Sequence, residues 1–180
     1  MLDPVGVGAS AFRIRLAGEL LAAAHFAAIR CNQAELWTLC REVTFAGVDS
    51  SPMGSLEEVI RHAGRLSQKT GAALLVTGET DVIHWQGRTL LVRNGHPMMS
   101  RLTGSGCMLT GLLAALLAAS PQNPLECCAA ASAVMGLAGE MAFARMGPRD
   151  GMGSYKTYLF DAVTNLTEDD LKGGTRYEIR

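Results

Sequence analysis

The chain has 180 residues and a formal net charge of −1, with 48% hydrophobic and 18% charged residues. This balance is typical of one packed globular domain and excludes a long disordered chain. Because no cluster of Lys and Arg stands out, the composition argues against a nucleic-acid partner and against an anionic membrane surface.

The cysteine pattern indicates a reducing compartment. The chain has five cysteines, and none of them forms a C-x-x-C pair. An odd number of cysteines without such pairs indicates neither a disulfide framework nor a zinc site.

The start, Met1 to Pro4, lacks a signal-peptide pattern, and the apolar run 112–119 is shorter than the about 20 residues that span a bilayer. We therefore expect a cytoplasmic protein that does not act at a membrane.

The first part of the chain predicts strands and helices in alternation. Residues 1–5 are expected to end a strand, and a helix over 12–24 follows. The short apolar run 26–30 predicts a buried strand. Asn32 is expected to cap a helix that extends to Leu39.

The clearest helix lies in the middle of the chain. Ser55 and Glu58 form a capping-box pattern before a stretch of helical periodicity, and Gly71 is placed to end it. The preceding residues 45–54 are rich in Gly, Ser and Pro and predict a loop. The apolar run 72–76 predicts a strand that is covered on both faces.

The second half predicts a hairpin and then mainly helices. The hairpin is expected over 82–92, with a turn at Gln86-Gly87-Arg88. Apolar, small-residue patterns predict helices over 103–119, 125–146 and 155–165.

Strands that alternate with helices favour an α/β fold with a mostly parallel sheet. We expect a single domain over residues 1–165, followed by a polar, frayed tail over 166–180.

The sharpest local motif is Thr103-Gly104-Ser105-Gly106-Cys107, directly before an apolar helix. Glycines allow an anion to approach the backbone, and the free N–H groups and dipole of a helix start favour negative charge. A nucleotide phosphate is the natural ligand, although a Gly-x-Gly before a helix is often only a tight turn. The motif is neither a Walker A loop nor a Rossmann fingerprint. Cys107 is either an activated thiol or a small packed side chain.

Polar side chains follow the predicted strands. Asp3 ends one strand, Arg30 and Glu35 follow the next, and Thr77 closes the apolar strand. Carboxyl ends of strands are where open α/β sheets bind ligands. Each residue also has a local interpretation as a turn former or a helix cap.

The order of these motifs resembles the hydroxyethylthiazole kinase family. The series runs from Asp3-Pro4-Val5 with Gly8, through Ile29-Arg30-Cys31-Asn32-x-x-Glu35 and Val76-Thr77-Gly78-Glu79, to Thr103-Gly104-Ser105-Gly106-Cys107. The resemblance implies a ribokinase-like, three-layer α/β/α fold and a homotrimer. It also implies that ATP phosphorylates the hydroxyl group of 4-methyl-5-(2-hydroxyethyl)thiazole in thiamin salvage.

The resemblance implies a role for each matching residue. Asp3 and Glu35 would organise Mg²⁺, the cofactor, and its waters, while Arg30 and Thr77 would contact ATP.

In the same resemblance, Gly104, Ser105 and Gly106 would form an anion hole for the transferred phosphoryl group and border the thiazole. Cys107 would lie beside the reacting hydroxyl group.

Departures from the family pattern leave two hypotheses open. Cys31 replaces a usual Gly, and the family's first strands and helices have no counterpart, so the fold is expected to be truncated at its N-terminus. The chain is either a thiamin-salvage kinase or a noncatalytic ATP-binding or interaction module on the same fold. A ribokinase-like hydratase is disfavoured because Cys107 stands where that group has Asp.

Overall fold

The computed structural model describes residues 1–41 and 54–180. Their strands form one five-stranded sheet, in which spatial order follows chain order. The strands are β1 (Ala28–Asn32), β2 (Ala73–Thr77), β3 (Asp81–Trp85), β4 (Arg88–Val92) and β5 (Tyr177–Ile179). The loop predicted over 45–54 lies, apart from Gly54, outside the described residues.

The predicted mostly parallel sheet is wrong. Among the five strands of the described residues, only β1 and β2 pair in parallel, with an isolated parallel bridge from Leu2 to Ile29, and the remaining pairs are antiparallel. The connections explain the difference, because a parallel crossover needs a dozen or more residues. Residues 78–80 alone join β2 to β3, and Gln86 and Gly87 turn β3 into β4 with φ values of 48° and 78°. Such a turn suits the predicted hairpin.

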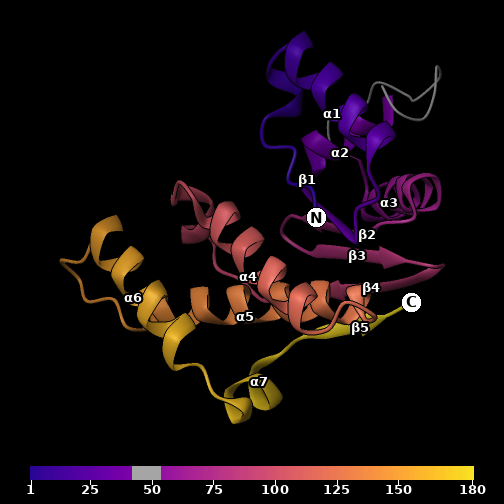
Figure 1. Ribbon diagram of the computed structural model, residues 1–180. Coiled ribbons are helices and arrows are strands. Elements are labelled where there is room, and N and C mark those ends of the chain that lie inside the picture. Colours follow the sequence, from indigo (N-terminus) through magenta and orange to yellow (C-terminus); the bar gives the residue numbers. More distant parts are fainter. Residues whose placement is uncertain (42–53) are drawn as a thin grey trace.

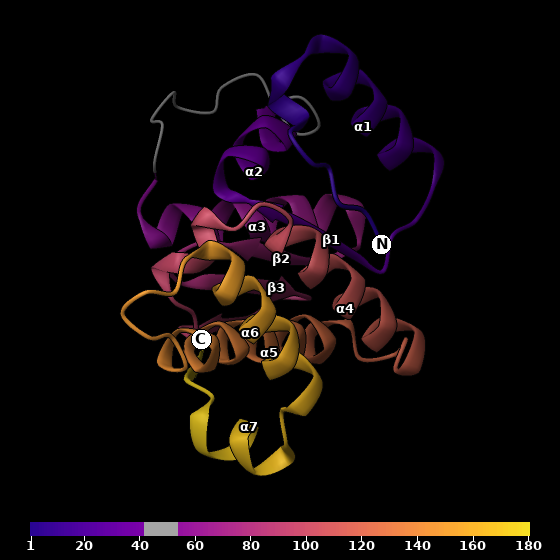
Figure 2. The ribbon, with the colours of Figure 1, turned by 90° about the vertical axis from the view of Figure 1, so that its left-hand side faces the viewer.

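Helices cover both faces of the sheet (Figures 1 and 2). One side carries α1 (Ala11–Ala23), α2 (Gln33–Leu39) and α3 (Leu56–Thr70). The other side carries α5 (Pro124–Ala144), against which α4 (Ser105–Ala119) and α6 (Met152–Asn165) pack. The described residues thus form a three-layer α/β arrangement.

Strand β2 connects the two hydrophobic cores. Leu74 and Val76 belong to the core under α3, whereas Ala73 and Leu75 belong to the core over α5. Because successive strand side chains point to opposite faces, a continuous apolar run supplies both layers. The prediction of a strand covered on both faces is confirmed.

Helix α5 is the central helix of its layer. Its length and apolar composition would suffice to cross a membrane, but 61% of its most apolar window is buried inside the fold. It contacts α4, α6 and three strands of the sheet. Its apolar character is therefore that of a core helix.

Local capping signals are confirmed. Asn32 Oδ1 accepts the Glu35 backbone N–H at 2.9 Å, and Glu35 Oε2 accepts the Asn32 N–H at 2.9 Å. Ser55 and Glu58 form the same reciprocal box at the start of α3. Gly71 ends that helix with φ +73°, a conformation that favours glycine.

The prediction of a frayed tail over 166–180 is wrong. Residues 168–174 form α7 (Glu168–Gly174), and β5 then pairs with β4. The Arg180 backbone N–H donates to the Thr89 carbonyl at 2.9 Å, and the Arg93 N–H donates to the Arg176 carbonyl at 2.9 Å. The tail is thus the last strand of the sheet.

Candidate functional site

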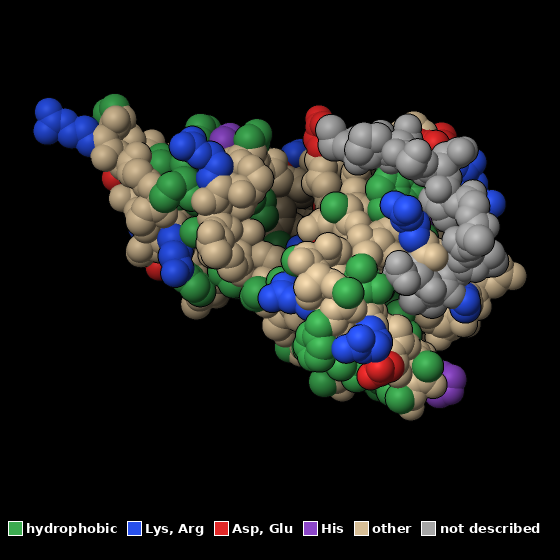
Figure 3. All heavy atoms as spheres, turned by 90° about the horizontal axis from the view of Figure 1, so that it is seen from above, with side chains coloured by type: hydrophobic (Ala, Val, Ile, Leu, Met, Phe, Trp, Pro, Cys, Tyr) green, Lys and Arg blue, Asp and Glu red, His purple; other side chains and the backbone are tan. Residues whose placement is uncertain are grey.

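The connections bring several strand ends together at one end of the sheet. Asn32 of β1 lies beside Thr77 of β2, and Asp81 of β3 pairs with Val92 of β4. A pocket of about 580 Å³ opens at this end. It is lined by residues at the strand ends, by residues after β4, by the start of α4, and by Met135 and Gly136 in the middle of α5. From above, the surface is hollowed between the side of α1 and α2 and the side of α6 (Figure 3).

Arg30 lies at the centre of the predicted polar set. Its Nη2 donates to Thr77 Oγ1 at 3.2 Å, and its Nη1 lies 3.6 Å from Asp3 Oδ1. Thr110 of α4 donates to the other oxygen of Asp3. The structure therefore joins three residues from the predicted set, and Arg30 and Thr77 line the pocket.

The start of α4 borders the same pocket through Ser105 and Gly106. Its N-cap residue, Gly104, has φ +95°, and no side chain caps the helix. An ideal Cβ atom at position 106 would lie 2.7 Å from both Nη atoms of Arg30. The guanidinium group and the positive end of the helix dipole are therefore adjacent, an arrangement that favours a phosphate group.

Asp3 fits a role beside a magnesium ion. Its Oδ1 is buried and accepts no hydrogen bond within the described part of the chain, where its one charged neighbour is Arg30. The same part of the chain holds no cluster of three or more His, Cys, Asp or Glu side chains. Mg²⁺ does not need such a cluster, because it is usually held by one or two carboxylates with waters and substrate phosphates.

Glu35 has the helix-capping contacts that its place three residues after Asn32 also predicts. Its Oε1 accepts the Gly6 N–H at 2.8 Å, and its Oε2 accepts the Asn32 N–H at 2.9 Å. It is buried and does not line the pocket. These contacts hold the turn after Asp3 against α2, and a magnesium role for Glu35 stays a prediction.

Cys107 is exposed and lies outside the pocket lining, although it follows Gly106 directly. Gly104 also lies outside the lining and shapes the turn into α4. The neighbouring Cys31 is fully buried, and burial raises the pKa of its thiol. Of the two cysteines, only Cys107 is accessible to a substrate.

Asp81 lines the pocket at the start of β3 and was not predicted from the sequence. Its Oδ1 accepts the Gly78 N–H at 2.9 Å, and its Oδ2 accepts the Ser132 hydroxyl at 2.7 Å. Burial raises the pKa of this carboxyl group, against the lowering effect of these hydrogen bonds. Its place four residues after Thr77, across a tight turn, was the available signal.

Comparison with known proteins decides the family. A model of the hydroxyethylthiazole kinase family matches residues 1–169. The chain belongs to this family. Hydroxyethylthiazole kinase of Clostridium acetobutylicum is 42% identical to it, over 99% of the chain and 67% of the relative. The protein of the same name from Methanoculleus marisnigri is 39% identical, over 100% of the chain and 63% of the relative.

A solved structure of hydroxyethylthiazole kinase protein from Pyrococcus horikoshii OT3 has the same fold. It superposes with a TM-score of 0.86 at 28% identity, over 99% of this chain and 64% of that one. The family resemblance and the α/β class are confirmed. The chain spans about two thirds of the length of these hydroxyethylthiazole kinases.

Proposed function

We propose that the chain belongs to a protein that transfers the terminal phosphoryl group of ATP to the hydroxyl group of 4-methyl-5-(2-hydroxyethyl)thiazole. One observation carries this proposal. The Arg30 guanidinium lies against Gly106 at the uncapped start of α4, and both border a pocket of about 580 Å³. A cation and a helix dipole that meet beside a pocket suit a transferred phosphoryl group.

Each residue then has a positioning or charge role. Arg30, held by Thr77 and Asp3, donates hydrogen bonds to phosphate oxygens. The N–H group of Gly106 faces the charge that develops on the phosphoryl oxygens, whereas the Ser105 N–H donates to the Leu102 carbonyl at 3.3 Å. Asp3 would hold Mg²⁺ through water, and the bound ion neutralises phosphate charge.

Proton transfer is assigned to Cys107. Its thiolate takes the proton of the substrate hydroxyl, the hydroxyl oxygen bonds to the terminal phosphorus, and the bond to the leaving ADP breaks. The exposure of Cys107 leaves its sulfur accessible to the alcohol. Phosphoryl transfer depends mainly on positioning and charge neutralisation, so this proton step contributes a modest part of the rate.

The assembly and compartment are also proposed. By resemblance to the family we expect a homotrimer, which fits the exposed apolar side chains Phe12, Leu16 and Leu20 on α1. The cysteine pattern supports a cytoplasmic location.

A noncatalytic ATP-binding module is the second candidate. The observation that favours it is that Cys107 lies outside the residues that line the pocket. In this candidate the phosphate site stays, but no alcohol is held beside it.

One experiment separates the two candidates. The purified chain is incubated with ATP, Mg²⁺ and hydroxyethylthiazole, and the phosphorylated thiazole is measured by mass spectrometry, while ATP binding is measured by calorimetry. Phosphorylated product supports the kinase. ATP binding without product supports the noncatalytic module, and absence of ATP binding contradicts both.

A further inference from the structure

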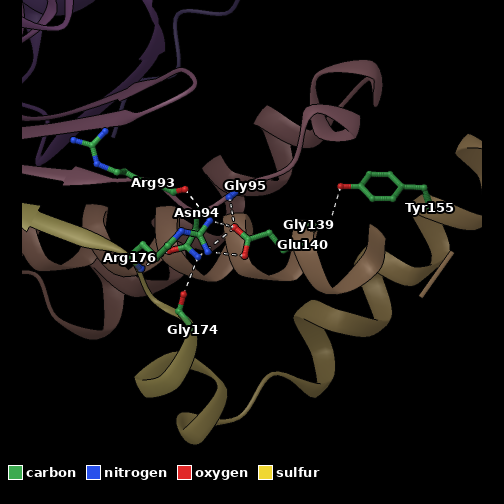
Figure 4. Close-up of polar contacts among 8 residues, drawn as sticks. All are labelled: Arg93, Asn94, Gly95, Gly139, Glu140, Tyr155, Gly174 and Arg176. Atoms are coloured by element: carbon green, nitrogen blue, oxygen red, sulfur yellow. Dashed lines mark hydrogen bonds and ion pairs between the residues drawn. The ribbon is translucent and has the colours of Figure 1, made fainter. Parts of the chain in front are cut away.

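The C-terminal tail reaches the turn after β4 through Arg176, which lies between α7 and β5 and beyond the residues that the family model matches. Its backbone N–H donates to Asn94 Oδ1 at 2.7 Å, and its Nη2 donates to the Arg93 carbonyl at 2.9 Å. Figure 4 shows its guanidinium directed at the carboxylate of Glu140 on α5.

Arg176 and Glu140 form a two-point ion pair. Nη2 lies 2.6 Å from Oε1, and Nη1 lies 3.1 Å from Oε2. Burial alone would raise the pKa of Glu140. The hydrogen bonds and charge of Arg176, together with the hydrogen bonds from Gly95 and Asn94, outweigh burial, so the pKa of Glu140 lies below its usual value. The carboxylate is therefore charged at neutral pH, and a bidentate pair of this kind fixes geometry as well as charge.

The same carboxylate holds the turn after β4. Glu140 Oε1 accepts the Gly95 N–H at 2.6 Å and the Asn94 side-chain amide at 3.3 Å (Figure 4). The Asn94 amide also donates to the Gly174 carbonyl at 3.0 Å. Asn94 and Gly95 line the pocket, so the tail and α5 together set the position of one of its walls.

This wall lies away from the phosphate end. Arg30 is on β1, whereas Asn94 and Gly95 follow β4, three strands along the sheet. Three strand spacings amount to about 14 Å. Because one pocket is lined both by Arg30 and by Asn94 and Gly95, a nucleotide with its phosphates at Arg30 would extend its nucleoside along the pocket toward this turn.

We propose that Arg176 and Glu140 are positioning residues that hold the nucleoside-binding wall of the pocket. This inference rests on the proposed binding of ATP in that pocket. Neither side chain touches the nucleotide in this proposal. Each acts through the turn at Asn94 and Gly95.

The test compares two ligands that share phosphates and differ in the nucleoside. Calorimetry of the 180-residue chain with ATP and Mg²⁺ is combined with competition by inorganic tripolyphosphate. For Arg176→Ala we expect about tenfold weaker ATP binding, because the variant loses a charge-assisted contact that positions the site. We expect its affinity for tripolyphosphate to stay within about twofold of the wild-type value. Arg176→Lys keeps one charged contact and should restore part of the ATP affinity.

Arg180→Ala is the matched control. Arg180 lies in the same tail and pairs with Glu57 and Glu178, but it has no contact with the turn after β4. We expect wild-type ATP affinity for this variant. Equal losses of ATP affinity in Arg176→Ala and Arg180→Ala, or equal losses for ATP and tripolyphosphate in Arg176→Ala, would overturn the inference alone.

Two further outcomes remain decisive. If Arg176→Ala does not fold, Glu140→Gln keeps an oxygen acceptor for Gly95 and removes the charge that holds Arg176. Glu140→Gln should weaken ATP binding and leave the affinity for tripolyphosphate unchanged. An unchanged ATP affinity in this variant would overturn the inference. A wild-type chain that binds tripolyphosphate or nothing, but not ATP, would overturn the proposed function together with it.

Discussion

Gly106 lies so close to Arg30 that any side chain at position 106 would meet the guanidinium group, with an ideal Cβ 2.7 Å from both Nη atoms. This contact gives the first prediction. Gly106→Ala should push Arg30 away from the start of α4 and weaken ATP binding about tenfold or more, because hydrogen bonds to charged groups contribute about 1.5–3 kcal/mol each. Calorimetry with ATP and Mg²⁺ measures the change.

Gly111 provides the control for this prediction on the same helix. A Cβ atom at position 111 would meet nothing within 4 Å. Gly111→Ala should keep ATP affinity and raise the free energy of unfolding by roughly 0.5–1 kcal/mol, the usual gain for Ala over Gly inside a helix. Similar losses of ATP affinity in both variants would show that α4 tolerates no added methyl group. The loss in Gly106→Ala would then not come from displacement of Arg30.

The second prediction concerns Cys107. If its thiolate accepts the alcohol proton, Cys107→Ala should lower thiazole turnover by about 10²-fold, the low end for general-base catalysis, with ATP affinity unchanged. Cys107→Asp supplies a carboxylate and should retain or raise turnover. The proton assignment is wrong if Cys107→Ala leaves turnover untouched while Cys107→Asp abolishes it.

The third prediction uses the raised pKa of Asp81. Because burial raises this pKa in the folded state, the charged carboxylate costs stability at neutral pH. As pH falls through the folded-state pKa, Asp81 binds a proton first in the folded state, so the cost begins to fall there and is gone only once pH drops below the unfolded value of about 3.9. Asp81→Asn should therefore raise the thermal midpoint at pH 7, and the gain should vanish below that pH.

Asp161→Asn is the comparison for Asp81, since it removes one negative charge at an exposed ion pair with Arg145. We expect no stabilisation at pH 7 from this change, because surface pairs contribute about 0–1 kcal/mol. A lower midpoint for Asp81→Asn at pH 7 would show that the ionised contacts to Gly78 and Ser132 outweigh the cost of burial.

The fourth prediction concerns the outer face of α1. Phe12, Leu16 and Leu20 recur every four residues on one face and are 61%, 41% and 39% exposed. An apolar stripe of this kind favours association. Sedimentation of the wild-type chain should show species larger than a monomer, and Leu16→Glu should shift them toward monomer. Phe160→Glu, on α6, is the control, and a monodisperse wild-type monomer would contradict the prediction.

Local chemistry explains what the sequence could predict of the fold. Helix caps and tight turns depend on residues only a few positions apart. The predictions of this kind are confirmed for the cap of Asn32 with Glu35, the end of α3 at Gly71, and the turn at Gln86. The antiparallel pair of β3 and β4 was predicted as a hairpin, whereas the antiparallel pairing of β2 with β3 was missed, although residues 78–80 are too few for a parallel crossover. The pairing of β5 was missed because a three-residue strand is too short to carry a periodic signal, and its partner lies far away in sequence.

The candidate site divides in the same way. Arg30, Thr77 and Asp3 were chosen because they lie near the ends of predicted strands, and the structure brings them together. Glu140 and Arg176 have no motif, since their contact joins residues 36 positions apart. The functional roles of all the predicted site residues, Glu35 and Cys107 among them, stay predictions.

The central claim is that Arg30 and the start of α4 bind the phosphates of a nucleotide. Calorimetric titration of the wild type and Arg30→Ala with ATP and Mg²⁺ tests it most directly. We expect the wild type to bind and Arg30→Ala to bind about 10- to 100-fold more weakly, as expected for the loss of charged hydrogen bonds. Equal ATP affinity in the two proteins would contradict the claim.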